Sequence, residues 1–94
     1  MKMNTVITSY HYTIQGHKIN NEGSTFEDAF IVNDNYTIKQ VIFLYTANSN
    51  CQYEADYARL EYIEHLTIDL SERSVIKVER EELNGNIEEI EMEV

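Results

Sequence analysis

The sequence predicts an α+β fold: an antiparallel sheet of about four to six strands that ends in a three-stranded meander, with one or two short helices. Segments near both ends of the chain alternate along their length and are rich in β-branched and aromatic residues, which is typical of strands. Asn84-Gly85 lies between two such segments, and this dipeptide is a strong hairpin signal. The 94 residues contain no proline, no low-complexity linker and no repeat, so we expect one domain, 1–94.

The first predicted element is a strand from Thr5 to Gln15. Its residues alternate, with Tyr10, Tyr12 and Ile14 on one side of the strand. Gly16 is then expected to begin a turn, and the segment 18–20 to form a short returning strand.

A helix is predicted to begin at Ser24. Ser24 and Glu27 match a capping box, in which each residue bonds the backbone N–H of the other. Phe26, Ala29 and Phe30 then share one face at helical spacing, and the segment 33–35 ends the helix. The apolar run 41–45 predicts a largely buried strand over 36–46, followed by a loop over 48–50.

The segment 52–65 fits two structures. Its Ala, Glu, Arg and Leu content favours a helix with a stripe of Tyr53, Tyr57 and Leu60. A period of two from Ala58 to Leu70 leaves a long strand as the alternative. We predict a helix to about Glu64 and a strand over 66–70.

The C-terminal hairpin has two candidate registers. After a polar turn over 71–74, a two-residue Asn84-Gly85 loop would place apolar residues opposite acidic ones. A three-residue loop, Leu83-Asn84-Gly85, with Gly85 in the left-handed conformation, pairs apolar with apolar. It sets Ile76 opposite Met92, Val78 opposite Ile90, and Arg80 opposite Glu88. Because a slip of one residue exchanges the two faces of a strand, the hydrophobic match favours the three-residue loop.

This register predicts a row of carboxylates. If Ile90, Met92 and Val94 face the core, the intervening glutamates must point into solvent, and Glu79 lies opposite Glu89, a like-charge pair that costs stability. The predicted acidic face consists of Glu79, Glu81, Glu89, Glu91 and Glu93.

The charge of the chain limits its partners. The formal net charge is -10, and residues 48–94 hold thirteen acids and four bases. Direct nucleic-acid binding requires an excess of Lys and Arg, so it is disfavoured, and a basic protein surface is the better partner. No segment has a secretory signal or the ~20 apolar residues of a membrane span, so we expect no membrane and a cytoplasmic location.

The residue types give little support for catalysis. Cys51 is the single cysteine, and His11, His17 and His65 have no metal-ligand spacing. His11 is expected on a strand surface, His17 in a turn and His65 near a helix end. We therefore expect no catalytic residues, no metal and no cofactor.

The function predicted from these observations is protein binding. The acidic face would act as a nucleic-acid mimic that inhibits or modulates a nucleic-acid enzyme, with Tyr53 and Tyr57 as aromatic anchors. In size, acidity and Asn, Lys and Ile content the chain resembles accessory proteins of phages and mobile elements, several of which inhibit host enzymes such as CRISPR nucleases; no motif carries this resemblance. The alternative is an assembly module that forms a homodimer through an edge strand or a tyrosine patch, with the acidic face serving solubility.

Overall fold

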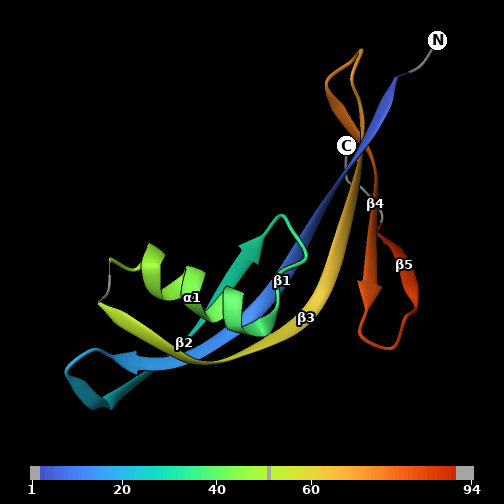
Figure 1. The fold of residues 1–94 in the computed structure, drawn as a ribbon. Coiled ribbons are helices and arrows are strands. Elements are labelled where there is room, and N and C mark those ends of the chain that lie inside the picture. Colours follow the sequence, from blue (N-terminus) through green and yellow to red (C-terminus); the bar gives the residue numbers. More distant parts are fainter. Residues whose placement is uncertain (1–2, 51, 91–94) are drawn as a thin grey trace.

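A computed structural model describes residues 3–50 and 52–90, which form one five-stranded antiparallel sheet and one helix. The α+β fold predicted from the sequence is therefore confirmed. The strand order is β2-β1-β3-β4-β5, and the last three strands form the expected meander (Figure 1). The elements are β1 (Asn4–Lys18), β2 (Asn21–Val32), α1 (Ile38–Asn48), β3 (Tyr53–Asp69), β4 (Ser74–Glu82) and β5 (Ile87–Ile90).

The sheet has two halves, joined by the long strands β1 and β3 (Figure 1). In the covered half, residues 10–62, α1 packs across one face. The arm, residues 3–9 and 63–90, consists of the remaining ends of β1 and β3 with β4 and β5. The radius of gyration is 16.5 Å, whereas a compact chain of this length has about 12 Å. The molecule is therefore elongated, at 56 × 28 × 25 Å.

The core lies in the covered half, between α1 and the face of the sheet that we call the helix face. Ile14 of β1 and Val41 of α1 are completely buried. Around them pack Tyr12, Val32, Ala55 and Ala58, with partly buried aromatic residues at the margin. We call the other face, which no described element covers, the open face. His11, Gln15 and His17 of β1 point to it, because side chains alternate along a strand.

Tyr45 fixes the helix to β2. Its hydroxyl donates to Asp28 Oδ2 at 2.8 Å, and its ring packs against Phe26 and Phe30 at centroid distances of 5.6 and 5.3 Å. Burial, together with this hydrogen bond, raises the pKa of Tyr45 to about 12. The hydroxyl therefore remains a donor throughout the physiological pH range.

The helix predicted at Ser24 is wrong, because this segment is strand β2. Phe26 and Phe30 are four residues apart, a spacing that fits one face of a helix and one face of a strand equally well. Val32 continues the period of two and is buried on the same face, whereas Ala29 is exposed. Pairing with β1 along nearly the whole length of β2 outweighs the local capping signal.

The strand predicted over 36–46 is also wrong, because residues 38–48 form α1. Thr37 is the N-cap: its hydroxyl accepts from the Gln40 backbone N–H at 3.2 Å, and Gln40 Oε1 accepts from the Thr37 N–H at 2.9 Å. This is a complete capping box. Within the described residues, no helix combines the length and apolar character needed to cross a bilayer.

We expect Thr37→Ala to lower the free energy of unfolding by about 1 kcal/mol, because the substitution removes the acceptor that caps α1. Thr37→Ser keeps the hydroxyl and should remain close to wild type. Urea denaturation followed by circular dichroism measures both variants. Equal stability of Thr37→Ala and Thr37→Ser would show that the cap contributes nothing.

The segment 53–69 is one long strand, β3, so the predicted helix to Glu64 is wrong and the alternative is correct. Two β-bulges, at Asp56 and Glu61, interrupt its pairing with β1. Each bulge inserts one unpaired residue and keeps Ala55, Ala58 and Leu60 on the helix face. The bulges hide the period of two from a simple reading of the sequence.

The first turn lies further along the chain than predicted. Gly16 is inside β1, paired with both Phe26 and Ala55, and the predicted returning strand over 18–20 does not form. The turn is Ile19-Asn20, with Asn20 at φ 71°, a conformation that asparagine tolerates better than most residues.

The C-terminal hairpin has the predicted register. Val78 pairs with Ile90 and Arg80 with Glu88, and Gly85 has φ 85° in the three-residue loop. The pairing of Ile76 with Met92 lies outside the described residues. The expectation that Ile90 faces the core is wrong, since the core is at the other end of the molecule and no described element covers this side of the hairpin.

Candidate functional site

The predicted acidic residues Glu79, Glu81 and Glu89 lie together on the helix face of the arm. Glu79 is directly opposite Glu89, and Glu81 is two residues further along β4. Residues opposite each other have Cβ atoms about 5 Å apart, and alternate residues on a strand about 6.8 Å apart. The structure therefore brings three of the five predicted carboxylates into one cluster. Glu91 and Glu93 lie outside the described residues.

Two of these three carboxylates have a basic or histidine partner. Lys77 Nζ lies 3.4 Å from Glu79 Oε1, and His65 Nε2 lies 3.3 Å from Glu81 Oε2. The other ring nitrogen of His65, Nδ1, is 3.0 Å from the Thr8 hydroxyl oxygen, which fixes the ring. Glu89 is exposed and has no ion-pair partner among residues 3–50 and 52–90. It is the least compensated charge of the cluster.

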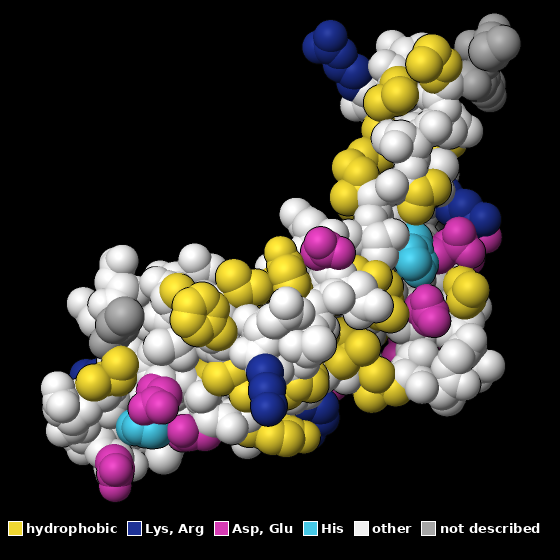
Figure 2. Space-filling view, viewed as in Figure 1, with side chains coloured by type: hydrophobic (Ala, Val, Ile, Leu, Met, Phe, Trp, Pro, Cys, Tyr) yellow, Lys and Arg dark blue, Asp and Glu magenta, His cyan; other side chains and the backbone are white. Residues whose placement is uncertain are grey.

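The remaining glutamates of the hairpin point the other way. Glu82 and Glu88 share the open face with Arg80, and Glu64 of β3 is opposite Arg80. The negative charge of the arm is therefore divided between its two faces. Figure 2 shows acidic side chains close to a histidine at the base of the arm, with hydrophobic side chains exposed beyond them.

The two predicted tyrosine anchors lie far from this cluster and on opposite faces. Tyr53 packs edge-on against Phe26 on the helix face, with ring centroids 5.2 Å apart. Tyr57 is 49% exposed and pairs with Gln15 on the open face. Ile63, the partner of Glu81, is six positions beyond Tyr57 in β3, a separation of about 20 Å along an extended strand. A single flat partner surface cannot contact all of these residues.

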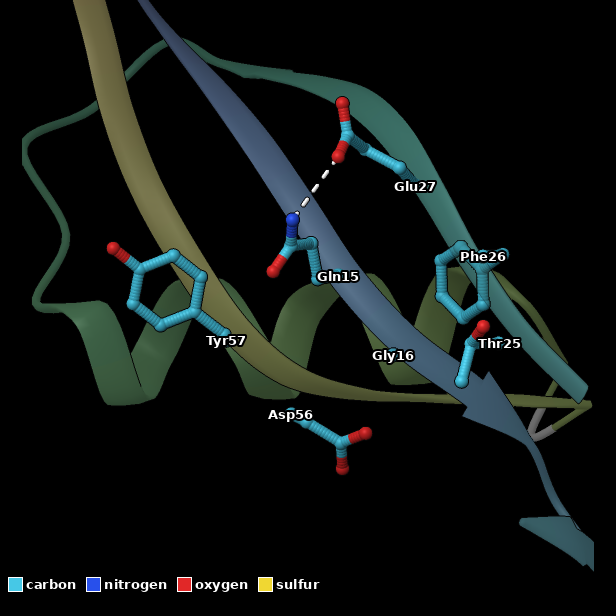
Figure 3. A pocket seen from close by; sticks show the side chains of 7 residues that line it. All are labelled: Gln15, Gly16, Thr25, Phe26, Glu27, Asp56 and Tyr57. Atoms are coloured by element: carbon cyan, nitrogen blue, oxygen red, sulfur yellow. Dashed lines mark hydrogen bonds between the residues drawn. The ribbon is translucent and has the colours of Figure 1, made fainter. Parts of the chain in front are cut away.

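A shallow groove crosses the covered half near Tyr57 (Figure 3). Both of its carboxylates already have hydrogen-bond partners: Glu27 accepts from Gln15 Nε2 at 3.0 Å, and Asp56 Oδ2 lies 2.7 Å from His17 Nδ1. The groove therefore presents no carboxylate free of an internal partner. Its lining is Gln15, Gly16, Thr25, Phe26, Glu27, Asp56 and Tyr57.

His17 is held between two carboxylates at the edge of this groove. Besides the contact with Asp56, its Nε2 lies 3.4 Å from Glu54 Oε2. The hydrogen bond to Asp56 is the main cause that raises the pKa of His17 above its ordinary value of 6.5. His17 lies on β1 and not in the turn where the sequence placed it.

We expect this contact to make stability depend on pH. Because the folded-state pKa of His17 is raised, the stabilisation by the contact between His17 and Asp56 is complete below about pH 6.5. This stabilisation is lost as the pH rises through the folded-state pKa. Asp56→Asn should lower the His17 pKa in an NMR titration. It should also lower the melting temperature more at pH 5.5 than at pH 8.5. A destabilisation of equal size at both pH values would contradict this assignment.

Sequence reasoning missed two side-chain groups that depend on the pairing of β3 with its neighbouring strands. The first is the Thr8–His65–Glu81 chain, with His65 in the middle of a strand and not near a helix end. The second is on the open face, where the rings of His11 and Tyr62 stack at 4.3 Å. Neither group has a local signal, since the β1 and β3 partners are more than fifty residues apart in sequence and His65 and Glu81 are 16 apart.

The described residues contain no group of three or more ligating side chains placed to hold a metal ion. Cys51 lies outside the described residues, so its predicted place in a loop is not tested. Comparison with protein-family models, with curated proteins and with solved structures found no match to this chain.

Proposed function

We propose that this protein is a non-catalytic binding protein that places the acidic helix face of its arm against a basic protein surface. The target class that fits best is a nucleic-acid enzyme, whose phosphate-binding groove would accept the carboxylates of Glu79, Glu81 and Glu89. Binding of this kind would inhibit or modulate the enzyme by occupying the site of its nucleic acid.

The observation that supports this proposal most is the like-charge pair across the hairpin. Glu79 and Glu89 are directly opposite each other, an arrangement that destabilises a hairpin, and Glu89 is exposed. A strand that needed only solubility could use threonine or lysine at either position. The repulsion would be relieved when a cationic surface binds, so it favours association with such a surface.

The arm also has a suitable shape. It projects from the covered half as a narrow sheet (Figure 1), so its helix face is accessible beyond the end of α1. Neighbouring strand positions of these glutamates are about 5–7 Å apart, which allows several carboxylates to contact the cationic side chains of one groove. Tyr53 and Tyr57 are not needed for this contact.

The proposal predicts salt-sensitive capture that depends on these carboxylates. Immobilised protein should retain specific proteins from a nuclease-treated bacterial lysate at 50 mM NaCl and release them at 500 mM, because ion pairs between exposed groups are screened by salt. Added duplex DNA should compete for the retained proteins. The double variant Glu79→Gln/Glu89→Gln should lose at least nine-tenths of the capture.

A matched control removes the same charge elsewhere. Glu22→Gln/Glu27→Gln changes two glutamates of β2, in the covered half, and should capture as well as wild type. Equal loss in both double variants would show that only the net charge matters. Unchanged capture by Glu79→Gln/Glu89→Gln, or no competition by DNA, would overturn the proposal.

An assembly role is the second candidate function. The observation that favours it is an apolar row on the open face of the arm, which no described element covers. This role does not require that the acidic helix face bind anything.

A further inference from the structure

Four apolar residues form a row across the open face of the arm. The register pairs Ile7 with Leu66, Leu66 with Val78, and Val78 with Ile90. Each strand of the arm therefore contributes one aliphatic side chain to the same face. The row continues the face on which His11 and Tyr62 lie in the covered half.

Nothing in the described chain packs on this row. Ile7 is 45% exposed, and the other three residues are half-buried by their neighbours within the sheet. A sheet with an apolar face normally buries it against a second layer, and α1 supplies that layer only in the covered half and only on the other face. Among the described residues, the arm is therefore a single layer.

A row of charged residues runs beside the apolar row. It contains Glu64 of β3, Arg80 of β4 and Glu88 of β5, which are opposite one another in the register. Arg80 makes no ion pair with either glutamate among the described residues. Instead its guanidinium lies over the Tyr62 ring at 4.0 Å, and its buried Nε has no hydrogen-bond partner there. A buried donor without a partner costs stability, so the site would gain from an added acceptor.

The apolar row and the charged row are each complementary to the same row on a second copy of the chain. Consider a second copy stacked face to face about a two-fold axis that runs parallel to the strands, between β3 and β4. Rotation about this axis places Leu66 of one copy opposite Val78 of the other, and Ile7 of one copy opposite Ile90 of the other. It also carries Glu64 of each copy opposite Arg80 of its partner, because β3 and β4 exchange places. Because of the two-fold symmetry, each of these apolar and charged contacts forms twice in the dimer.

We infer that the protein forms a homodimer in which the open faces of two arms pack together as a two-layered sandwich. Aligned sheets pack in this way about 10 Å apart. Strands about 4.8 Å apart and residues rising about 3.3 Å give the arm a face of about 500 Å². Two copies would bury about 1,000 Å², the lower limit of a specific interface, so we expect a weak dimer that dissociates on dilution.

The inference does not rest on the proposed function. The acidic helix faces would point outward from the two sides of such a dimer, where each remains free to bind a partner. Capture by Glu79 and Glu89 and dimerisation through the open face can therefore succeed or fail separately.

Adjacent residues on β1 provide a matched test. Ile7 and Val6 are 45% and 58% exposed, but Val6 points to the helix face. Sedimentation equilibrium of the wild type should show a mass of two chains that dissociates on dilution. Ile7→Glu should weaken the dimer at least tenfold, whereas Val6→Glu should leave it unchanged. Circular dichroism checks that both variants fold.

Charge reversal at Glu64 or Arg80 tests whether the two-fold axis lies between β3 and β4. Glu64→Arg alone places arginines opposite arginines across the two-fold axis, and Arg80→Glu alone places glutamates opposite glutamates. Each variant should therefore be mainly monomeric. An equimolar mixture should restore a dimer with one chain of each kind, since both cross-pairs are then oppositely charged.

Restoration on mixing would establish the contact between Glu64 and Arg80 of different copies. A wild type that remains monomeric at millimolar concentration would overturn the inference and leave the open face to a different partner. A dimer that Ile7→Glu and Val6→Glu affect equally, or that mixing fails to restore, would also overturn this geometry.

Discussion

Gly16→Ala is expected to lower the free energy of unfolding by about 3 kcal/mol, because overpacking against rigid backbone forces strands apart. A Cβ at residue 16 would lie 2.1 Å from the Glu54 carbonyl oxygen and 3.0 Å from Ala55 Cα. The Phe26 ring is also close, at 2.9 Å. The backbone of β3 cannot move away without breaking its pairing with β1 beside the Asp56 bulge. Urea denaturation followed by circular dichroism measures the loss.

Gly23→Ala is the control for this prediction. Gly23 is exposed on β2, and an added Cβ would meet only the Asn21 side chain, at 3.7 Å. Alanine also restricts the unfolded chain, so Gly23→Ala should be neutral or stabilise by about 0.5 kcal/mol. Similar destabilisation by both substitutions would mean that the close approach at Gly16 is not the cause.

The C-terminal hairpin could be predicted from the sequence because its determinants are local. Gly85 supplies the left-handed residue, and the hydrophobic match between Val78 and Ile90 selects the register. Both signals lie within about a dozen residues. The pairing of Glu79 with Glu89, and so part of the candidate site, followed directly from that register.

The middle of the chain was mispredicted because two periods compete there. Phe26 and Phe30 fit a helix face as well as a strand face, and the apolar run 41–45 fits a buried strand as well as a short helix. Pairing with β1 decides the first case, and the Thr37–Gln40 capping box decides the second. Thr37 and Gln40 have the spacing of a capping box, which the prediction of a strand over 36–46 overlooked, whereas the pairing of β2 with β1 has no local signal.

The surroundings of the site depend on contacts distant in sequence. His65 lies beside Thr8 because β1 pairs with β3 in a register that two bulges adjust, and beside Glu81 because β3 pairs with β4. A residue pattern does not show where bulges occur. For the same reason the sequence could not show that the apolar side of the hairpin is left uncovered.

The core lies in the covered half, and the arm contains none of its residues. β1 and β3 run through both halves, so the arm depends on strands that are held in the covered half. A single sheet whose apolar face packs against no second layer is marginal in water. Loss of the core should therefore unfold the arm as well, although no core residue belongs to it.

Ile14→Ala tests this dependence. Ile14 is completely buried between β2, β3 and α1, and a cavity there should cost about 3 kcal/mol. For a chain of this size, that corresponds to a melting temperature lower by about 12–24 °C. Val6→Ala, at an exposed position of the same strand in the arm, should cost less than about 0.5 kcal/mol.

Hydrogen exchange shows whether the two halves unfold together. In Ile14→Ala, amide protection should fall by a similar factor in the covered half and in the paired residues 65–67 and 77–79 of the arm. Protection lost only in the covered half would show that the arm is stable by itself. In a dimer, the partner copy would supply the arm with a second layer. Amide protection of the arm should therefore be measured at protein concentrations below and above the dissociation constant of the dimer. If the amides of the arm in Ile14→Ala stay protected only at high protein concentration, the arm is stabilised by the partner copy.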